Sequence, residues 1–349
     1  MIPAIWFCLV AIVITGYVIL DGFDLGAGVI HLFVARSQRQ RGQVLRSIGP
    51  FWDGNEVWLL AGGGTLYFAF PALYASAFSG FYLALMIVLW LLILRGIAIE
   101  FRNHVAGDMW RSFWDAVFGG SSGLLALLLG VALGNVVRGV ALDANGYFFL
   151  PLWTDFKPGK DAGIVDWYTL SIGAASLIAL SVHACTWVIL KTTGDLQTNS
   201  RRFLRAMWWL MAAATILITA ISFQVQPILE GRFLAQPWGF IFPLIALAGL
   251  LGIRICSARA SDLAAFCSSC AYLLGMLTSV VFGVFPNVLP SNSDPGLSLT
   301  IYNASAPAYG LKIGLWWWIP GMLLATGYSV FAYAHFAGKV QMEDVGPGD

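Results

Sequence analysis

Charged residues are scarce in this sequence. Only 11% of the 349 residues are Asp, Glu, Lys or Arg, whereas 59% are hydrophobic, against roughly 25% charged residues in an ordinary soluble domain. A formal net charge of +1 provides no basic surface for a nucleic acid, so no such partner is expected. Repeated apolar runs of about 20 residues, the length that crosses a bilayer, predict an all-α membrane protein.

Nine apolar segments can be marked along the chain. The first has no basic residue before it and no small-residue cleavage pattern after it, which favours a retained span over a signal peptide. Segments one to four and five to eight run in the same directions, which predicts two four-helix bundles in a pseudo-repeat, plus one extra helix. The predicted units are 1–142, 143–290, and 291–349 for the ninth helix with a cytoplasmic tail. The segments are 3–34, 56–75, 77–98, 114–141, 164–190, 206–225, 238–256, 263–289 and 310–337.

Basic residues are distributed unequally between the two sets of predicted loops. Counted with nine spans, 14 Lys and Arg residues lie on the side that follows the first span, Arg95 and Arg102 among them, and 5 lie on the other side. Cytoplasmic loops carry the excess of Lys and Arg. The distribution therefore predicts a periplasmic N-terminus and a cytoplasmic C-terminus.

Four carboxylates lie at the neighbouring ends of the first two spans. Asp21 and Asp24 are three residues apart and share a helix face, and Asp53 and Glu56 repeat this spacing after a short arginine-rich loop. An unpaired charge costs roughly 2.5 to 3.5 kcal/mol at the bilayer centre. Carboxylates that lie close together at one depth can share protons. The four acids therefore predict a proton-transfer site open to the cytoplasm.

Simpler structural roles compete with this interpretation. Asp53 and Glu56 have the spacing of a capping box at the start of the second span. Asp21 and Asp24 could instead pair with nearby arginines. Both alternatives stay open at the level of sequence.

Histidine is rare, with four residues in the whole chain. His31 and His183 are expected at similar depths, in spans that are equivalent under the predicted repeat. A bis-histidine b-type haem between them is one interpretation, and ordinary hydrogen bonding near the membrane surface is the other. No metal ligands are otherwise expected in this chain.

Six sequence blocks, taken in order, resemble subunit II of the cytochrome bd-type quinol oxidases, including the cyanide-insensitive branch. They extend from the first span to the start of the ninth, so the resemblance covers nearly the whole chain. The blocks are Gly22-Phe23-Asp24-Leu25-Gly26, Trp52-Asp53-Gly54-Asn55-Glu56-Val57-Trp58, Ala77-Phe78-Ser79-Gly80-Phe81-Tyr82, Lys191-Thr192-Thr193-Gly194-Asp195-Leu196, Phe285-Pro286-Asn287-Val288-Leu289-Pro290 and Leu299-Thr300-Ile301-Tyr302-Asn303-Ala304.

The resemblance implies a subunit of a respiratory terminal oxidase in the bacterial cytoplasmic (inner) membrane. Such a complex oxidises quinol, reduces dioxygen to water and takes its protons from the cytoplasm, which builds a proton gradient. It implies a heterodimer in which subunit I holds two haems b, one haem d and the quinol-oxidising loop. The present chain would be its haem-free, non-catalytic partner, and a small single-helix subunit is a further candidate member.

Within that family, the matching motifs assign proton transfer to Asp24 and Asp53, with Asp21 and Glu56 in support. Two alternatives remain. A proton-coupled secondary transporter would use the same acids, with its substrate between two parallel repeats. A stand-alone b-type cytochrome would use His31 and His183 as haem ligands.

Overall fold

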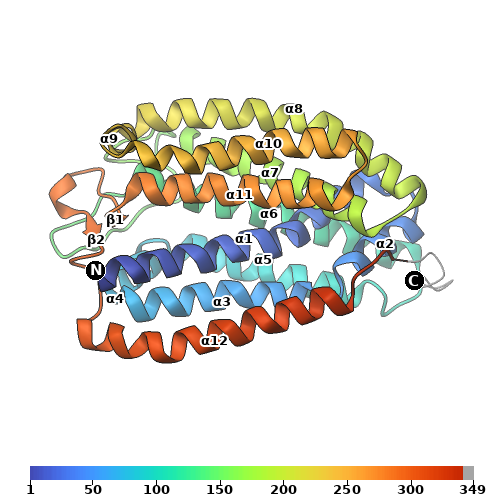
Figure 1. Ribbon diagram of the computed structural model, residues 1–349, viewed down its shortest axis with the longest axis horizontal. Helices are drawn as coiled ribbons and strands as arrows, with labels where there is room; N and C mark the ends of the chain where they lie inside the picture. The colour runs from blue at the N-terminus through green and yellow to red at the C-terminus, as the bar shows by residue number, and fades with distance from the viewer. Residues whose placement is uncertain (341–349) are drawn as a thin grey trace.

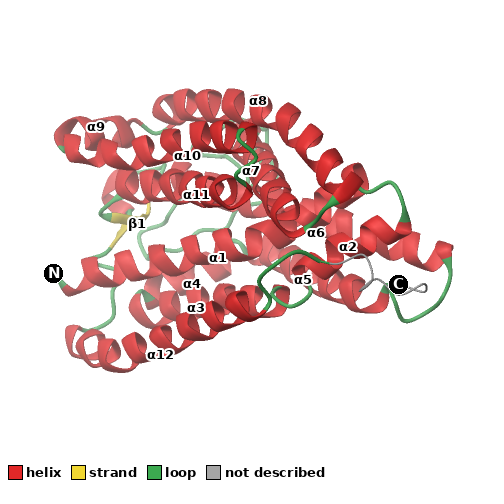
Figure 2. Ribbon diagram, turned by 45° about the vertical axis from the view of Figure 1, so that its right-hand side comes forward, coloured by secondary structure: helices red, strands yellow, loops and turns green. Residues whose placement is uncertain are grey.

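The structure is a computed structural model that describes residues 1–340, and the predicted tail at 343–349 lies outside this range. Helices account for almost all of its regular structure (Figures 1 and 2). They are α1 (Ile2–Val34), α2 (Gln38–Ile48), α3 (Trp52–Ala69), α4 (Pro71–Gly80), α5 (Tyr82–Phe101), α6 (Asp108–Arg138), α7 (Trp167–Lys191), α8 (Gly194–Val225), α9 (Pro227–Ala235), α10 (Ile241–Ala258), α11 (Asp262–Val284) and α12 (Ala308–His335), with 3-10 turns η1 (Pro237–Phe240) and η2 (Pro295–Leu297).

The long helices lie side by side along the long axis of the molecule (Figure 1). Seven of the helices in the described part of the chain are long and apolar enough to cross a membrane: α1, α5, α6, α7, α8, η1 with α10, and α11. Helices α3 and α12, with 18 and 28 residues, lie outside that group. The all-helical membrane class is confirmed, while the count of nine spans stays a prediction.

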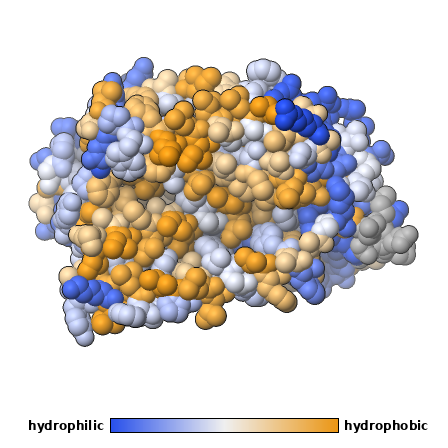
Figure 3. All heavy atoms as spheres, viewed as in Figure 1, coloured by the Kyte–Doolittle hydropathy of each residue, from blue (hydrophilic) through white to orange (hydrophobic). Residues whose placement is uncertain are grey.

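The surface has the polarity of a membrane protein. Figure 3 shows apolar side chains gathered over the middle of the visible face and hydrophilic side chains concentrated toward its ends. One end carries the short antiparallel pair β1 (Asn287–Leu289) and β2 (Leu299–Thr300), seen in yellow in Figure 2. The opposite end carries α2 and the last described residues, near the label C (Figure 1).

Three element boundaries differ from the sequence-based expectation. The arginine-rich loop is helix α2, which Ser37 caps by accepting a hydrogen bond from the Gln40 N–H at 3.2 Å. The span predicted at 56–75 breaks at Phe70, because Pro71 has no N–H to continue the helix and starts α4 instead. Helix α8 begins at Gly194 rather than 206, so its first turns hold the charged residues assigned to a loop.

Helix α1 is the centre of the fold and contacts α3, α6, α7 and α11. Its approach to α7 is so close that a Cβ added at Gly26 would lie 2.1 Å from the backbone carbonyl of Leu180. Residues two positions apart point to opposite sides of a helix. Because Gly26 faces α7, Asp24 lies on the opposite side of α1 and faces α3.

The long helices of both predicted units pack through one shared core. Helices α1, α3, α5 and α6 pack in sequence-adjacent pairs, as do α7, α8, α10 and α11, and α1 and α6 both contact α7 across the boundary. A buried hydrophobic cluster includes residues of both sets, such as Phe23, Phe118 and Trp187. The division at 142/143 and 290/291 stays a prediction.

Candidate functional site

Helix α1 carries a continuous buried polar face. Tyr17, Asp21, Asp24, Gly28 and His31 follow one another at intervals of four, three, four and three residues, and this spacing places them on one side of a helix. Tyr17 is 4% exposed, and both aspartates and His31 are 0% exposed. An otherwise apolar helix thus directs its polar groups into the protein rather than toward lipid.

Asp21 is held by a fully buried arginine. Arg95 of α5 donates from Nη1 to Asp21 Oδ2 at 2.8 Å and from Nη2 to Asp21 Oδ1 at 2.6 Å, a bidentate pair. Its Nη2 also lies 3.5 Å from Glu56 Oε2, and the Glu56 side chain is 27% exposed. For Asp21, the expectation of a paired arginine is therefore correct.

Asp24 has a different environment. Its Oδ2 accepts a hydrogen bond of 2.8 Å from the Asn55 amide, whereas its Oδ1 has no hydrogen-bond partner. Asn55 is fixed in turn, because it donates to the Leu20 carbonyl at 3.1 Å and accepts from the Tyr333 hydroxyl at 3.0 Å. No ion pair to Asp24 occurs within residues 1–340. Asp24 is thus a buried carboxyl group with one oxygen available to bind a proton or a water molecule.

Asp53 lies apart from the other three acids. It is in the first turn of α3 with its side chain on the exposed side of the helix, while Asp21, Asp24 and Glu56 gather around Arg95 and Asn55. The cap residue of α3 is Phe51, and no side chain caps this end. The capping-box interpretation of Asp53 and Glu56 is therefore wrong.

Two residues that complete the site were missed at the level of sequence. Arg95 was counted among the cytoplasmic loop residues, but it lies inside α5 and is 0% exposed. A lone arginine within an apolar run is itself a signal of a buried carboxylate partner. For Asn55, the only sign of a functional role in the sequence was its position between Asp53 and Glu56.

The structure separates the two histidines that were considered as haem ligands. His183 contacts the Ile19 carbonyl through Nε2 at 2.9 Å, and Ile19 precedes His31 by twelve residues, or about 18 Å along α1. The other His183 nitrogen, Nδ1, bonds to Ser269 Oγ at 2.7 Å. His31 Nδ1 donates to the Gly28 carbonyl at 2.6 Å. The expectation of similar depths is wrong, and this pair does not fit as the two axial ligands of one haem.

A second cluster of charges surrounds Asp115 on α6. Arg102 Nε donates to its Oδ1 at 2.6 Å, Arg41 Nη1 of α2 donates to its Oδ2 at 3.0 Å, and His31 Nε2 lies 3.7 Å from Oδ1. Asp115 is 1% exposed, while the Arg41 side chain is 25% exposed. This cluster connects the inner end of α1 with the surface next to α2.

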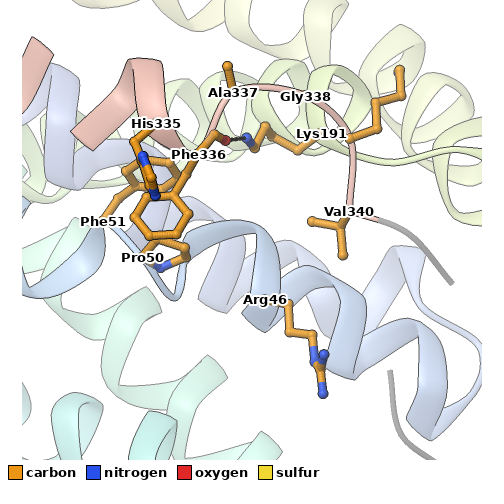
Figure 4. Close-up of a pocket in the computed structure, with 10 residues that line it drawn as sticks. Arg46, Pro50, Phe51, Lys191, His335, Phe336, Ala337, Gly338 and Val340 are labelled. Carbon is orange, nitrogen blue, oxygen red and sulfur yellow. Dashed lines mark hydrogen bonds between the residues drawn. The ribbon is translucent and has the colours of Figure 1, made fainter. Parts of the chain in front are cut away.

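A pocket of about 230 Å³ lies at the same end of the molecule (Figure 4). Lys191 donates to the Phe336 carbonyl at 2.6 Å, shown as a dashed line, and the Val340 N–H donates to the Lys191 carbonyl at 2.8 Å. Lys339 donates to the carbonyls of Ile189 and Thr192 at 3.2 and 3.0 Å. These bonds anchor the chain after α12 to the end of α7, beside the pocket.

A comparison with known protein families shows to which family this chain belongs. A family model described as cytochrome bd terminal oxidase subunit II matches residues 2–336. The chain belongs to this family. The resemblance of the six sequence blocks to subunit II of the bd-type oxidases is thereby confirmed.

Individual subunit II relatives are similar over almost their whole length. The probable cytochrome oxidase subunit 2 of Haemophilus influenzae is 30% identical, with 96% of this chain and 94% of the relative covered. The cytochrome bd-I ubiquinol oxidase subunit 2 of Escherichia coli is 27% identical, with 98% and 96% covered. The cytochrome bd ubiquinol oxidase subunit 2 of Bacillus subtilis is 28% identical, with 97% of both chains covered.

The fold is also that of a solved bd oxidase. A chain of the bd oxidase from Geobacillus thermodenitrificans superimposes with a TM-score of 0.74 and 18% identity, covering 96% of this chain and 98% of that one. Family membership makes the protein a subunit of an oxidoreductase complex that contains haem and pairs a subunit II with a subunit I. Its membrane-crossing helices and bacterial relatives make it a bacterial inner-membrane protein.

Proposed function

We propose that this chain is the haem-free subunit of a quinol-oxidising, dioxygen-reducing complex, in which it stabilises the haem-bearing subunit I and supplies a proton route from the cytoplasm. Family membership supports the first part, together with relatives whose names describe ubiquinol oxidase subunits. The chemistry of the haems belongs to the partner. The residues of this chain take up protons and transfer them.

The observation that carries the proton route is the contrast between the two aspartates on α1. Asp21 is fixed by Arg95, so its negative charge is neutralised permanently. Asp24 has only an amide and one unpartnered oxygen, so no resident cation holds it in the ionised form. A buried carboxyl group that can change its charge without breaking an ion pair is suited to carry a proton.

The other two acids have supporting roles in this proposal. Asp53 is exposed at the start of α3, where it takes up protons or passes them along the exposed surface of this chain. Glu56 lies one turn further along α3, 27% exposed and 3.5 Å from Arg95, and it follows Asp53 on the way to the buried acids. Arg95 keeps the local charge balanced while Asp24 changes its protonation state.

The comparisons do not favour either alternative. A family match over residues 2–336 provides no basis for a secondary transporter. A stand-alone b-type cytochrome would need His31 and His183 near each other, but His183 of α7 contacts α1 at Ile19, twelve residues before His31.

Variants of Asp24 and Asp53 in the purified two-subunit complex test the proton route. We expect Asp24→Asn to slow quinol-driven oxygen consumption at least about tenfold, because an amide cannot carry a proton, and Asp53→Asn to slow it less. The haem absorbance should stay unchanged, since the amide keeps the shape of the side chain. Glu230→Gln, at an exposed acid on α9, is the matched control. Full turnover of Asp24→Asn would disprove the route.

A further inference from the structure

We propose that a second access path reaches Asp24 along the interface of α1 and α6, in which His31 takes up protons from the surface and passes them through water held by Ser122. This inference rests on the proposed proton route and adds residues to it. It starts from buried polar atoms on α1 and α6 that have no hydrogen-bond partner within the described part of the chain.

Three such atoms belong to the polar face of α1 and to the neighbouring helix α6. They are Asp24 Oδ1, Ser122 Oγ and His31 Nε2, and none has a hydrogen-bond partner. All three side chains are 0% exposed. Buried polar groups are almost always hydrogen-bonded to protein or to ordered water. Their burial without partners therefore indicates internal water between these helices.

The positions of these residues along α1 suit single water molecules. Ser122 Oγ faces Gly28, so closely that a Cβ at position 28 would lie 2.2 Å from it. Gly28 lies about one helical turn from both, with a rise of about 6 Å for the four residues to Asp24 and about 4.5 Å for the three residues to His31. One water molecule with two hydrogen bonds bridges about 5.6 Å. Ser122 thus stands where water from Asp24 and water from His31 would meet.

His31 is set up to accept and release a proton. Its Nδ1 is occupied, because it donates to the Gly28 carbonyl at 2.6 Å. In the neutral ring, Nε2 is therefore an acceptor. It faces Asp115 Oδ1 at 3.7 Å, which is too long for a direct hydrogen bond but short enough to stabilise an imidazolium ion. Proton uptake at Nε2 creates this ion, and release toward Ser122 restores the neutral ring.

The outer end of the path is the Asp115 cluster. Asp115 faces His31 from α6, Arg41 from α2 and Arg102 from the end of α5. Only Arg41 reaches the surface, with 25% of its side chain exposed. The path therefore opens next to α2 and not at Asp53, so the two approaches to Asp24 can be blocked separately.

The test uses the complete complex in liposomes, with quinol and oxygen, and measures proton uptake and oxygen consumption. His31→Gln keeps an amide that can donate to the Gly28 carbonyl but cannot carry a proton. We expect it to slow proton uptake about twofold, because the approach at Asp53 stays open, and to raise the solvent deuterium isotope effect, with the haem absorbance unchanged. Ser122→Ala should act in the same direction without a loss of assembly, because its hydroxyl makes no hydrogen bond in the protein.

Two comparisons separate this inference from the proposed function. Ser121→Ala is the matched control, because the Ser121 hydroxyl is bonded to the carbonyls of Val117 and Phe118 and lies outside the path; its turnover should be unchanged. In an Asp24→Asn background, His31→Gln should have no additional effect. Wild-type rates for both His31→Gln and Ser122→Ala, with Asp24→Asn slow, would overturn the path alone. A fast Asp24→Asn enzyme would overturn the proposed function and the path together.

Discussion

At the scale of single residues, Arg95 has the largest expected effect on stability. Removing it would leave Asp21 as an unpaired buried charge, which costs about 3–5 kcal/mol. We expect Arg95→Leu to abolish assembly, measured as the haem absorbance of the purified complex. Arg95→Lys should assemble in part, because a lysine replaces the charge but not the bidentate geometry. Arg259→Ala, at an exposed arginine, should assemble normally.

Asn55 provides a second prediction at this scale. Its amide is the only hydrogen-bond donor to Asp24 within residues 1–340. Asn55→Ala should lower the stability of the complex by about 1–3 kcal/mol, the cost of leaving a buried polar group unpaired, and should reduce turnover because Asp24 loses its fixed orientation. Thermal unfolding and oxygen consumption measure the two effects. A variant with wild-type stability would show that Asn55 does not support Asp24.

At this scale, the sequence located the four acids at neighbouring helix ends but not their individual environments. Asp21 and Asp24 have the same residue type and the same depth, and their difference arises from Arg95, which is 74 residues away from Asp21 in the chain. Which acid receives the arginine depends on how α5 packs against α1. The exposure of Asp53 likewise depends on the rotation of α3, which no local pattern determines.

At the scale of elements, the start of α7 is a fixed point of the structure. Asp166 caps this helix by accepting from the N–H groups of Tyr168 and Thr169, and it also pairs with the buried Arg138 at the end of α6. Asp166→Ala removes both interactions, so we expect a loss of about 3–5 kcal/mol. Thermal unfolding of the complex measures it. Asp161→Ala, at an exposed acid of the same loop, should leave the melting temperature unchanged.

Helix α2 illustrates what local sequence could not reveal. Its arginines and glutamines indicated a loop, because an apolar span cannot contain them. The segment is nevertheless helical, since Ser37 caps it and its apolar side, with Val44 and Ile48, is buried. Its polar side supplies Arg41 to Asp115. Hydropathy finds spans and is insensitive to a short helix at the membrane surface.

At the scale of the whole molecule, the orientation in the membrane can be tested directly. The distribution of Lys and Arg predicts an external loop at 143–166 and a C-terminus inside the cell, and it keeps this direction when Arg95 is removed from the count. A fluorescent protein that folds only in the cytoplasm should be bright when fused after the last residue and dark when inserted at Asn145. The reverse result would invert the topology.

The pairing of Arg95 with Asp21 also constrains how the protein is made. A guanidinium within α5, toward the C-terminal end of the helix, makes the transfer of that helix into lipid on its own less favourable, by up to about 2.5 to 3.5 kcal/mol. Helix α1 is synthesised first and already carries the matching carboxylate. We therefore expect α5 to stay at the translocon after its synthesis until Arg95 pairs with Asp21 of α1. The two helices would then enter the lipid together and not independently.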